Sequence, residues 1–210
     1  IVVGLLGVIS AMALGFFVES IKATFTSEQK NLINRDIRQL TAKLSEAARQ
    51  ANFSILYESF EKSDRDSVSD RLLDGNSGDF LVFGFQDEPD LTTSVNAPQP
   101  ITRLIGYYRA PENPDDPDSM GPVRTFDTGP LPTPSDALDP PSPEELLEDL
   151  FSDSPTDEHN AVVELSEGLA DKRLFYNLGG RTIMVNGKIV HGVKAKRVTD
   201  TYNFTIATRR

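Results

Sequence analysis

The residue types that usually carry catalytic chemistry are sparse in this chain. It contains no cysteine and two histidines, His159 and His191, so it offers no thiol nucleophile and no histidine cluster for a metal. The HExxH, GxSxG, P-loop and GxGxxG motifs are missing from the sequence. We expect each histidine to be a surface or strand residue rather than a general base. The sequence therefore predicts no catalytic residue, no cofactor and a protein that is not an enzyme.

Carboxylates are the remaining candidates for a binding site. Asp64, Asp66 and Asp70 are spaced as in some calcium loops, but the glycine and closing glutamate of an EF-hand do not follow. We expect these three side chains to be solvated. Asp115, Asp116 and Asp118 lie close together in an acidic segment, and they are the candidate ligands of a cation.

That acidic segment spans residues 111–158 and holds fourteen acidic residues, eleven prolines and one basic residue, Arg124. Its composition predicts an extended surface loop that contributes little to the core. Within it, residues 123–126 are compatible with a short strand, and residues 143–151 with a short helix capped by Ser142. Two interpretations stay open: a solvated loop, or an acidic docking surface or cation site.

The distribution of basic residues argues against nucleic acid as a partner. The formal net charge is −11 and the isoelectric point is about 4.6. The basic C-terminal residues are not interleaved with exposed aromatic residues, as nucleic-acid-binding surfaces usually are. They could instead meet the acidic segment of a neighbouring subunit, a heterologous contact of the kind that builds filaments. These residues are Lys194, Lys196, Arg197, Arg209 and Arg210.

The first 18 residues form an uncharged apolar run that ends with Phe16, Phe17 and Val18. As a helix the run would reach about 27 Å, close to the ~30 Å hydrocarbon thickness of a bilayer. Small residues give one helix face a smooth seam along which another helix can approach closely. A generic single-pass anchor is the alternative, whereas the lack of a basic start disfavours a cleavable signal peptide. The seam consists of Gly4, Gly7, Ala11 and Gly15.

Residues 19–51 continue the helical period with a different polarity. Apolar residues recur at steps of three and four, and polar residues occupy the other faces. We expect this stripe to pack on a sheet rather than to form a coiled coil, because only three heptads are present and they end in alanines. A helix over residues 1–51 would be about 77 Å long, so half of it must project from the head. The predicted packing residues are Ile33, Ile37, Leu40 and Leu44.

The remaining residues, 52–210, predict an antiparallel head. Alternation and β-branched or aromatic content indicate strands near residues 53–57, 80–85, 101–109, 162–165, 174–178 and 201–206. The FLVFGF run at 80–85 is apolar on both faces and predicts a central strand. Asn186 and Gly187 predict a two-residue turn that joins strands 181–185 and 188–190 into a hairpin. The predicted class is α+β, with the long helix packed on a twisted antiparallel β-sheet head.

The apolar helix IVVGLLGVISAMALGFF, the stalk RDIRQLTAKLSEAARQA and the strand-like NFSILYESF together resemble the type IV pilin-like proteins. Within them, the chain looks most like the minor pseudopilins of type II secretion systems, particularly the larger J-type subunits. Aligning Gly7 with the glycine of family helices places the peptidase site, the methylated phenylalanine and the nearby glutamate upstream of Ile1. We then expect the first mature residues to be missing. If Ile1 is the mature terminus, Leu5 stands at the position of the acid.

The resemblance implies a structural subunit of a type II secretion or type IV pilus-like filament that assembles through its N-terminal helix. It implies a single-pass protein of the bacterial inner membrane with its head in the periplasm, and other pilin-like subunits as partners. Calcium is the cation that the resemblance suggests for the head. The alternative is a membrane-anchored periplasmic binding module whose acidic segment captures a cation or a basic partner.

Overall fold

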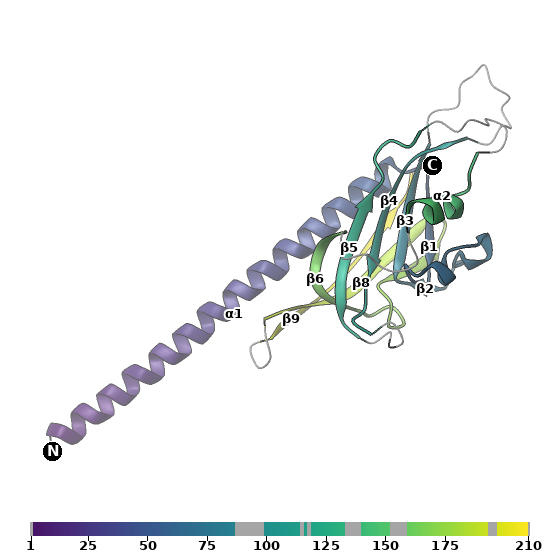
Figure 1. The fold of residues 1–210 in the computed structure, drawn as a ribbon. Coiled ribbons are helices and arrows are strands. Elements are labelled where there is room, and N and C mark those ends of the chain that lie inside the picture. The colour runs from purple at the N-terminus through teal and green to yellow at the C-terminus, as the bar shows by residue number, and fades with distance from the viewer. Residues whose placement is uncertain are drawn as a thin grey trace.

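A computed structural model provides the structure of the chain. It describes residues 2–86, 99–113, 116, 119–132, 140–151, 159–192 and 197–209. The described part consists of one long helix and a β-rich head that packs against the C-terminal half of that helix (Figure 1). Asp115, Asp118, Lys194, Lys196 and Arg210 lie outside the described residues.

The long helix α1 runs without a break from Val2 to Gln50. Its 49 residues correspond to a length of about 74 Å. The segment contains no proline, and its polar residues Thr24 and Thr26 donate to the carbonyls of Ser20 and Lys22 without interrupting the helix. Figure 1 shows that the N-terminal half projects away from the head.

Within the described residues, the head contains nine antiparallel strands in one sheet. The strand order is β1-β3-β4-β5-β6-β8-β7-β2, and β9 pairs with β8 along its full length. Every registered pair is antiparallel. The bounds are β1 Phe53–Tyr57, β2 Ser77–Gly78, β3 Phe80–Gln86, β4 Ile101–Arg109, β5 Gly121–Asp127, β6 Asn160–Gly168, β7 Phe175–Gly179, β8 Thr182–His191 and β9 Val198–Ala207.

The two ends of this strand order return to each other. The N–H of Asp79, directly after β2, donates to the carbonyl of Glu58, directly after β1, at 2.8 Å. Gly78 makes this approach possible, because a Cβ there would lie 2.1 Å from the carbonyl oxygen of Tyr57. The predicted fold, a long helix packed on an open twisted antiparallel β-sheet head, is therefore wrong, because the sheet is nearly closed and barrel-like. Strand patterns alone do not specify closure, because it depends on contacts between segments far apart in sequence.

Apolar side chains cover both faces of the sheet. One cluster joins α1 to the inner face through side chains such as Leu44, Phe83 and Val185. The second cluster lies on the outer face and joins β1, β3, β4 and β5 to the short helix α2, Pro143–Leu150. Strand β3 contributes Leu81 and Phe83 to the first cluster and Phe80 and Val82 to the second. This double burial explains its continuous apolar sequence.

The predicted hairpin at Asn186 and Gly187 is wrong. Both residues lie inside β8, where they pair with Asn203 and Tyr202 of β9. The glycine is needed for space, because a Cβ at position 187 would lie 2.4 Å from the Tyr202 hydroxyl oxygen and 2.9 Å from Leu174 Cδ1. An Asn-Gly pair thus serves close packing here rather than a turn.

The acidic segment contributes more to the core than its composition predicts. Strand β5 lies between β4 and β6, and its Val123 and Phe126 are buried. Helix α2 begins after Ser142, whose hydroxyl accepts the Glu145 N–H while the Glu145 carboxylate accepts the Ser142 N–H. Leu147 of α2 is fully buried. The prediction of a loop with little core contribution is wrong for these two elements, although the predicted cap is confirmed.

Candidate functional site

The N-terminal half of α1 presents large apolar side chains to solvent. Phe16 is 72% exposed and Phe17 is 63% exposed, far more than side chains that contribute to a core. We call the exposed set of Met12, Leu14, Phe16, Phe17, Val18 and Ile21 the bare apolar segment. Contiguous exposed apolar surface of this kind marks a site of interaction in water, because its burial is favourable.

The predicted small-residue seam lies on the same half of α1. Gly4, Gly7, Ala11 and Gly15 are all helical. A Cβ added at Gly7 or Gly15 would meet nothing within 4 Å, so no other part of the described chain approaches these two positions. The seam is thus unoccupied by the chain's own residues at Gly7 and Gly15.

The C-terminal half of α1 is held by the sheet. Ile33, Leu40 and Leu44 are fully buried in the inner cluster, and Ile37 packs against it while half-buried. Among the α1 residues whose burial the structure describes, Ile33 is the first that is fully buried, so the inner cluster begins at about this position. These contacts fix the direction in which the bare apolar segment projects.

A buried polar pair reinforces this attachment. His191 Nε2, at the end of β8, lies 2.9 Å from Asp36 Oδ2 on α1. Both side chains are 7% exposed. Sequence reasoning missed the pair, because 155 residues separate its members and no motif links them. The one available signal was Asp36, a carboxylate one residue before Ile37 on the apolar stripe.

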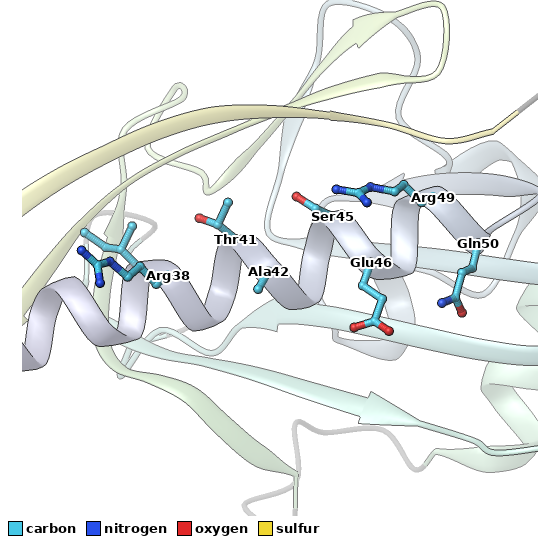
Figure 2. Close-up of a pocket in the computed structure, with 8 residues that line it drawn as sticks. Arg38, Thr41, Ala42, Ser45, Glu46, Arg49 and Gln50 are labelled. Carbon is cyan, nitrogen blue, oxygen red and sulfur yellow. The ribbon is translucent and has the colours of Figure 1, made fainter.

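A shallow groove follows the exposed face of the same half of α1. Its lining residues come entirely from the helix, so it is an open surface rather than an enclosed pocket (Figure 2). Small side chains, Thr41, Ala42 and Ser45, form its middle, whereas Arg38 and Arg49 are at its ends. The head therefore leaves one side of α1 uncovered even where it packs against the other side.

The most connected titratable cluster on the outer face joins α2 to the sheet. Glu144 is 3% exposed and accepts the Tyr57 hydroxyl at 2.6 Å. Arg71 donates to both of its carboxylate oxygens at 2.7 Å. Burial acts to raise the pKa of Glu144, but the hydrogen bonds from Arg71 and Tyr57 lower it overall. Burial and the bond to Glu144 raise the pKa of Tyr57. Glu144 is thus hydrogen-bonded to both Tyr57 and Arg71, and the cluster joins α2 to the sheet.

A second buried cluster surrounds Asp79. Arg109 donates to both Asp79 oxygens at 2.9 and 2.7 Å, and Arg173 adds a bond of 3.0 Å. The Leu174 N–H also donates to Asp79, so the carboxylate has partners on both oxygens. These bonds connect β3, β4 and the turn before β7. Their geometry fits a structural role, because every charge has a close partner of opposite sign.

The predicted cation ligands are only partly visible. Asp115 and Asp118 fall outside the described residues, and the carbonyl of Asp116 accepts the Ser119 N–H at 2.9 Å. Asp64 and Asp70 take part in local turns, since they accept bonds from the Ser59 hydroxyl and the Ser67 N–H. Among the residues that the structure describes, no group of three or more His, Asp or Glu side chains could hold a metal ion.

The structure places one histidine in a strand and the other just before a strand. His191 ends β8 in the buried pair described above. His159 is half-buried, and its Nδ1 lies 2.8 Å from the Tyr108 hydroxyl. Its ring packs among Phe60, Phe126 and Phe151. The aromatic surroundings place this histidine at the edge of the outer cluster.

Comparison of the chain with protein-family models, with curated proteins and with solved structures finds no match.

Across the helical residues that the structure describes, none of the helices combines the length and the apolar character needed to cross a membrane.

Proposed function

We propose that this protein is a structural subunit of a pilin-like filament, of the minor pseudopilin type, and that it assembles through the N-terminal half of α1. The observation that carries the proposal is one unbroken helix with two different halves. The half after Ile33 is buried in the head, whereas the half before it exposes the bare apolar segment. A rigid helix of this design delivers an apolar surface away from the head and at a fixed direction.

The physical argument is that the bare apolar segment requires a partner. Fully burying one phenylalanine side chain is worth about 1.5 to 3 kcal/mol, so neighbouring helices that cover Phe16 and Phe17 gain several such contributions. The seam at Gly7 and Gly15 has open space, which allows the backbone of another helix to approach closely. Helices of related subunits would supply the complementary surface.

The proposal includes a location before assembly. We propose that residues 1–18 hold the subunit in the bacterial inner membrane and that the head lies in the periplasm. Assembly then exchanges a lipid environment for a helical bundle, and both environments cover the same apolar side chains. The nine-stranded head would decorate the outside of the assembly, since its own apolar clusters are already satisfied by the sheet, α1 and α2.

The proposal is tested by removing detergent from the purified full chain and measuring its sedimentation. We expect the wild-type chain to form large assemblies as detergent is withdrawn. The double variant Phe16→Ser with Phe17→Ser should remain largely monomeric, because it removes two exposed rings from α1 without touching the head.

A matched control is available on the head. Val68 and Leu73 are also exposed apolar residues, at 60% and 75%. Their replacement by serine should leave assembly unchanged. A wild-type chain that stays monomeric without detergent, or equal assembly by the Phe16/Phe17 variant, would contradict the proposed function.

A further inference from the structure

A pocket lies beside β1, one of the two terminal strands of the strand order. Strand β1 pairs with β3 on one side, and on its other side the Leu72 segment links Leu56 to Asn177 of β7 by hydrogen bonds. A pocket of about 530 Å³ opens beside the N-terminal half of β1. Its other walls come from the β7–β8 region and from a proline run, Pro140, Pro141 and Pro143, that precedes α2. We call this space the seam pocket.

The backbone of β1 offers hydrogen-bonding groups to the seam pocket. The carbonyl of Leu56 accepts the Leu72 N–H at 2.8 Å, so the backbone groups of Leu56 point away from β3. Alternate residues of an antiparallel strand direct these groups to the same side. The N–H and C=O of Ser54 therefore point toward the seam pocket, which Ser54 lines. In the described part of the chain, no backbone hydrogen bond outside the regular strands involves Ser54.

The walls of the seam pocket suit a strand with apolar side chains. Phe53 and Ile55 belong to the outer cluster, whereas Leu56 and Ile183 belong to the inner one. A strand added beside β1 would direct alternate side chains toward these two faces. Apolar side chains could then extend both existing clusters.

The charges around the seam pocket balance. Arg71 is held by Glu144 through two bonds of 2.7 Å. The two other charged lining residues, Asp74 and Arg181, have opposite signs. A segment without net charge fits this environment best, because an added charge would be desolvated without a dedicated partner.

We propose that the seam pocket binds an extended, uncharged segment of a partner protein, which adds as an antiparallel or parallel strand to the open edge of β1. Recognition rests on main-chain bonds to Ser54 and on apolar side chains that enter the pocket. The added strand occupies the remaining gap between β1 and the β7–β8 region. This site is independent of assembly through α1.

The test uses the full chain in mild detergent and a fluorescent, N-acetylated and C-amidated heptapeptide pool. Threonine alternates in the pool with Val, Ile, Leu or Phe. We expect saturable binding by the wild-type chain, measured by fluorescence anisotropy. Ser54→Pro should weaken binding at least tenfold, because it removes the N–H at the open edge while leaving the pairing with β3. Ser54→Ala keeps that N–H and should bind within twofold of wild type.

A second measurement does not depend on any variant. The same pool with N-methylated backbone amides should lose binding to the wild-type chain, because methylation removes the donors that pair with β1. Absence of saturable binding by the unmethylated pool would overturn the proposal, as would equal binding of the methylated pool. Self-association of the chain that Ser54→Pro abolishes would also overturn it, because a second copy would then be the occupant.

Discussion

Single residues in this protein act mainly by fixing elements to one another. Glu144 joins α2 to β1 and to the segment after η2, Val68–Asp70, through Tyr57 and Arg71. Asp79 joins three parts of the sheet through Arg109 and Arg173. Each carboxylate is buried with cationic partners, and loss of one partner in such a group leaves an uncompensated buried charge. We therefore expect these groups to dominate the response of the head to mutation and pH.

Glu144 gives a testable pH dependence. Its pKa is lower in the folded protein than its ordinary value of 4.5, so the unfolded chain binds more protons between those two values. The stabilisation from this group is present above about pH 4.5 and is lost as the pH falls through the lower, folded pKa. Glu144→Gln should reduce the slope of stability against pH in the acid range by up to about 1.4 kcal/mol per pH unit.

The measurement is urea unfolding of the wild-type chain and the variant from pH 3 to pH 7. At pH 7 the variant should be less stable by about 1 to 3 kcal/mol, because the buried hydrogen bonds of Glu144 are weakened while the Arg71 side chain, 35% exposed, can still reach water. Glu148, which forms an exposed pair with Lys62, is the matched control, and Glu148→Gln should leave stability almost unchanged. Parallel acid profiles for Glu144→Gln and wild type would refute this assignment.

At the level of elements, the sequence predicts those whose signals are local. The strands at 53–57 and 101–109 coincide with β1 and β4, and the Ser142 cap marks the start of α2. Periodicity also predicts the stripe from Ile33 to Leu44 that lies in the inner cluster. The short strand predicted at residues 123–126 lies within β5, but the proline-rich acidic composition around it does not predict that Val123 and Phe126 are buried.

What could not be predicted depends on tertiary contacts. Closure of the sheet requires Gly78 to lie directly against the Tyr57 carbonyl oxygen. The sequence of β2 contains no pattern that predicts this contact. The Asp36–His191 and Glu144–Arg71 pairs join residues far apart in the chain. The Asn186–Gly187 pair predicts a turn, because nothing in the sequence shows that Gly187 packs closely against Tyr202.

The role of Gly187 can be tested by an energetic cycle. Gly187→Ala should destabilise the head by about 1 to 3 kcal/mol, the usual cost of overpacking, since its Cβ would displace the Tyr202 ring. The displacement would also disturb the contact of 3.2 Å between the Tyr202 and Ser166 hydroxyls. In a Tyr202→Val background the same substitution should cost much less. A turn at this position would give equal costs in both backgrounds, as measured by urea unfolding.

At the scale of the whole molecule, the head buries most of its large apolar side chains, whereas the N-terminal half of α1 leaves its apolar side chains exposed. The head satisfies its apolar surface with two clusters, on the inner and outer faces of the sheet. The bare apolar segment has no such cover, and α1 transmits its orientation because the helix is continuous into the inner cluster. The proposed assembly follows from this contrast. Removal of residues 112–157 would not isolate a role of the acidic segment, since it would also remove β5 and α2.

The most direct test of the account is a cross-link between copies through the apolar half of α1. The chain has no cysteine, so a single Gly15→Cys substitution introduces one thiol on the small-residue face of α1. After detergent is removed and a mild oxidant is added, the account predicts efficient disulfide-linked dimers of Gly15→Cys. The control Asp200→Cys, at an exposed position of β9, should assemble in the same way but form few disulfide-linked dimers. Absence of disulfide-linked dimers of Gly15→Cys under the same conditions, or equal cross-linking of both variants, would contradict the central claim that α1 is the assembly surface.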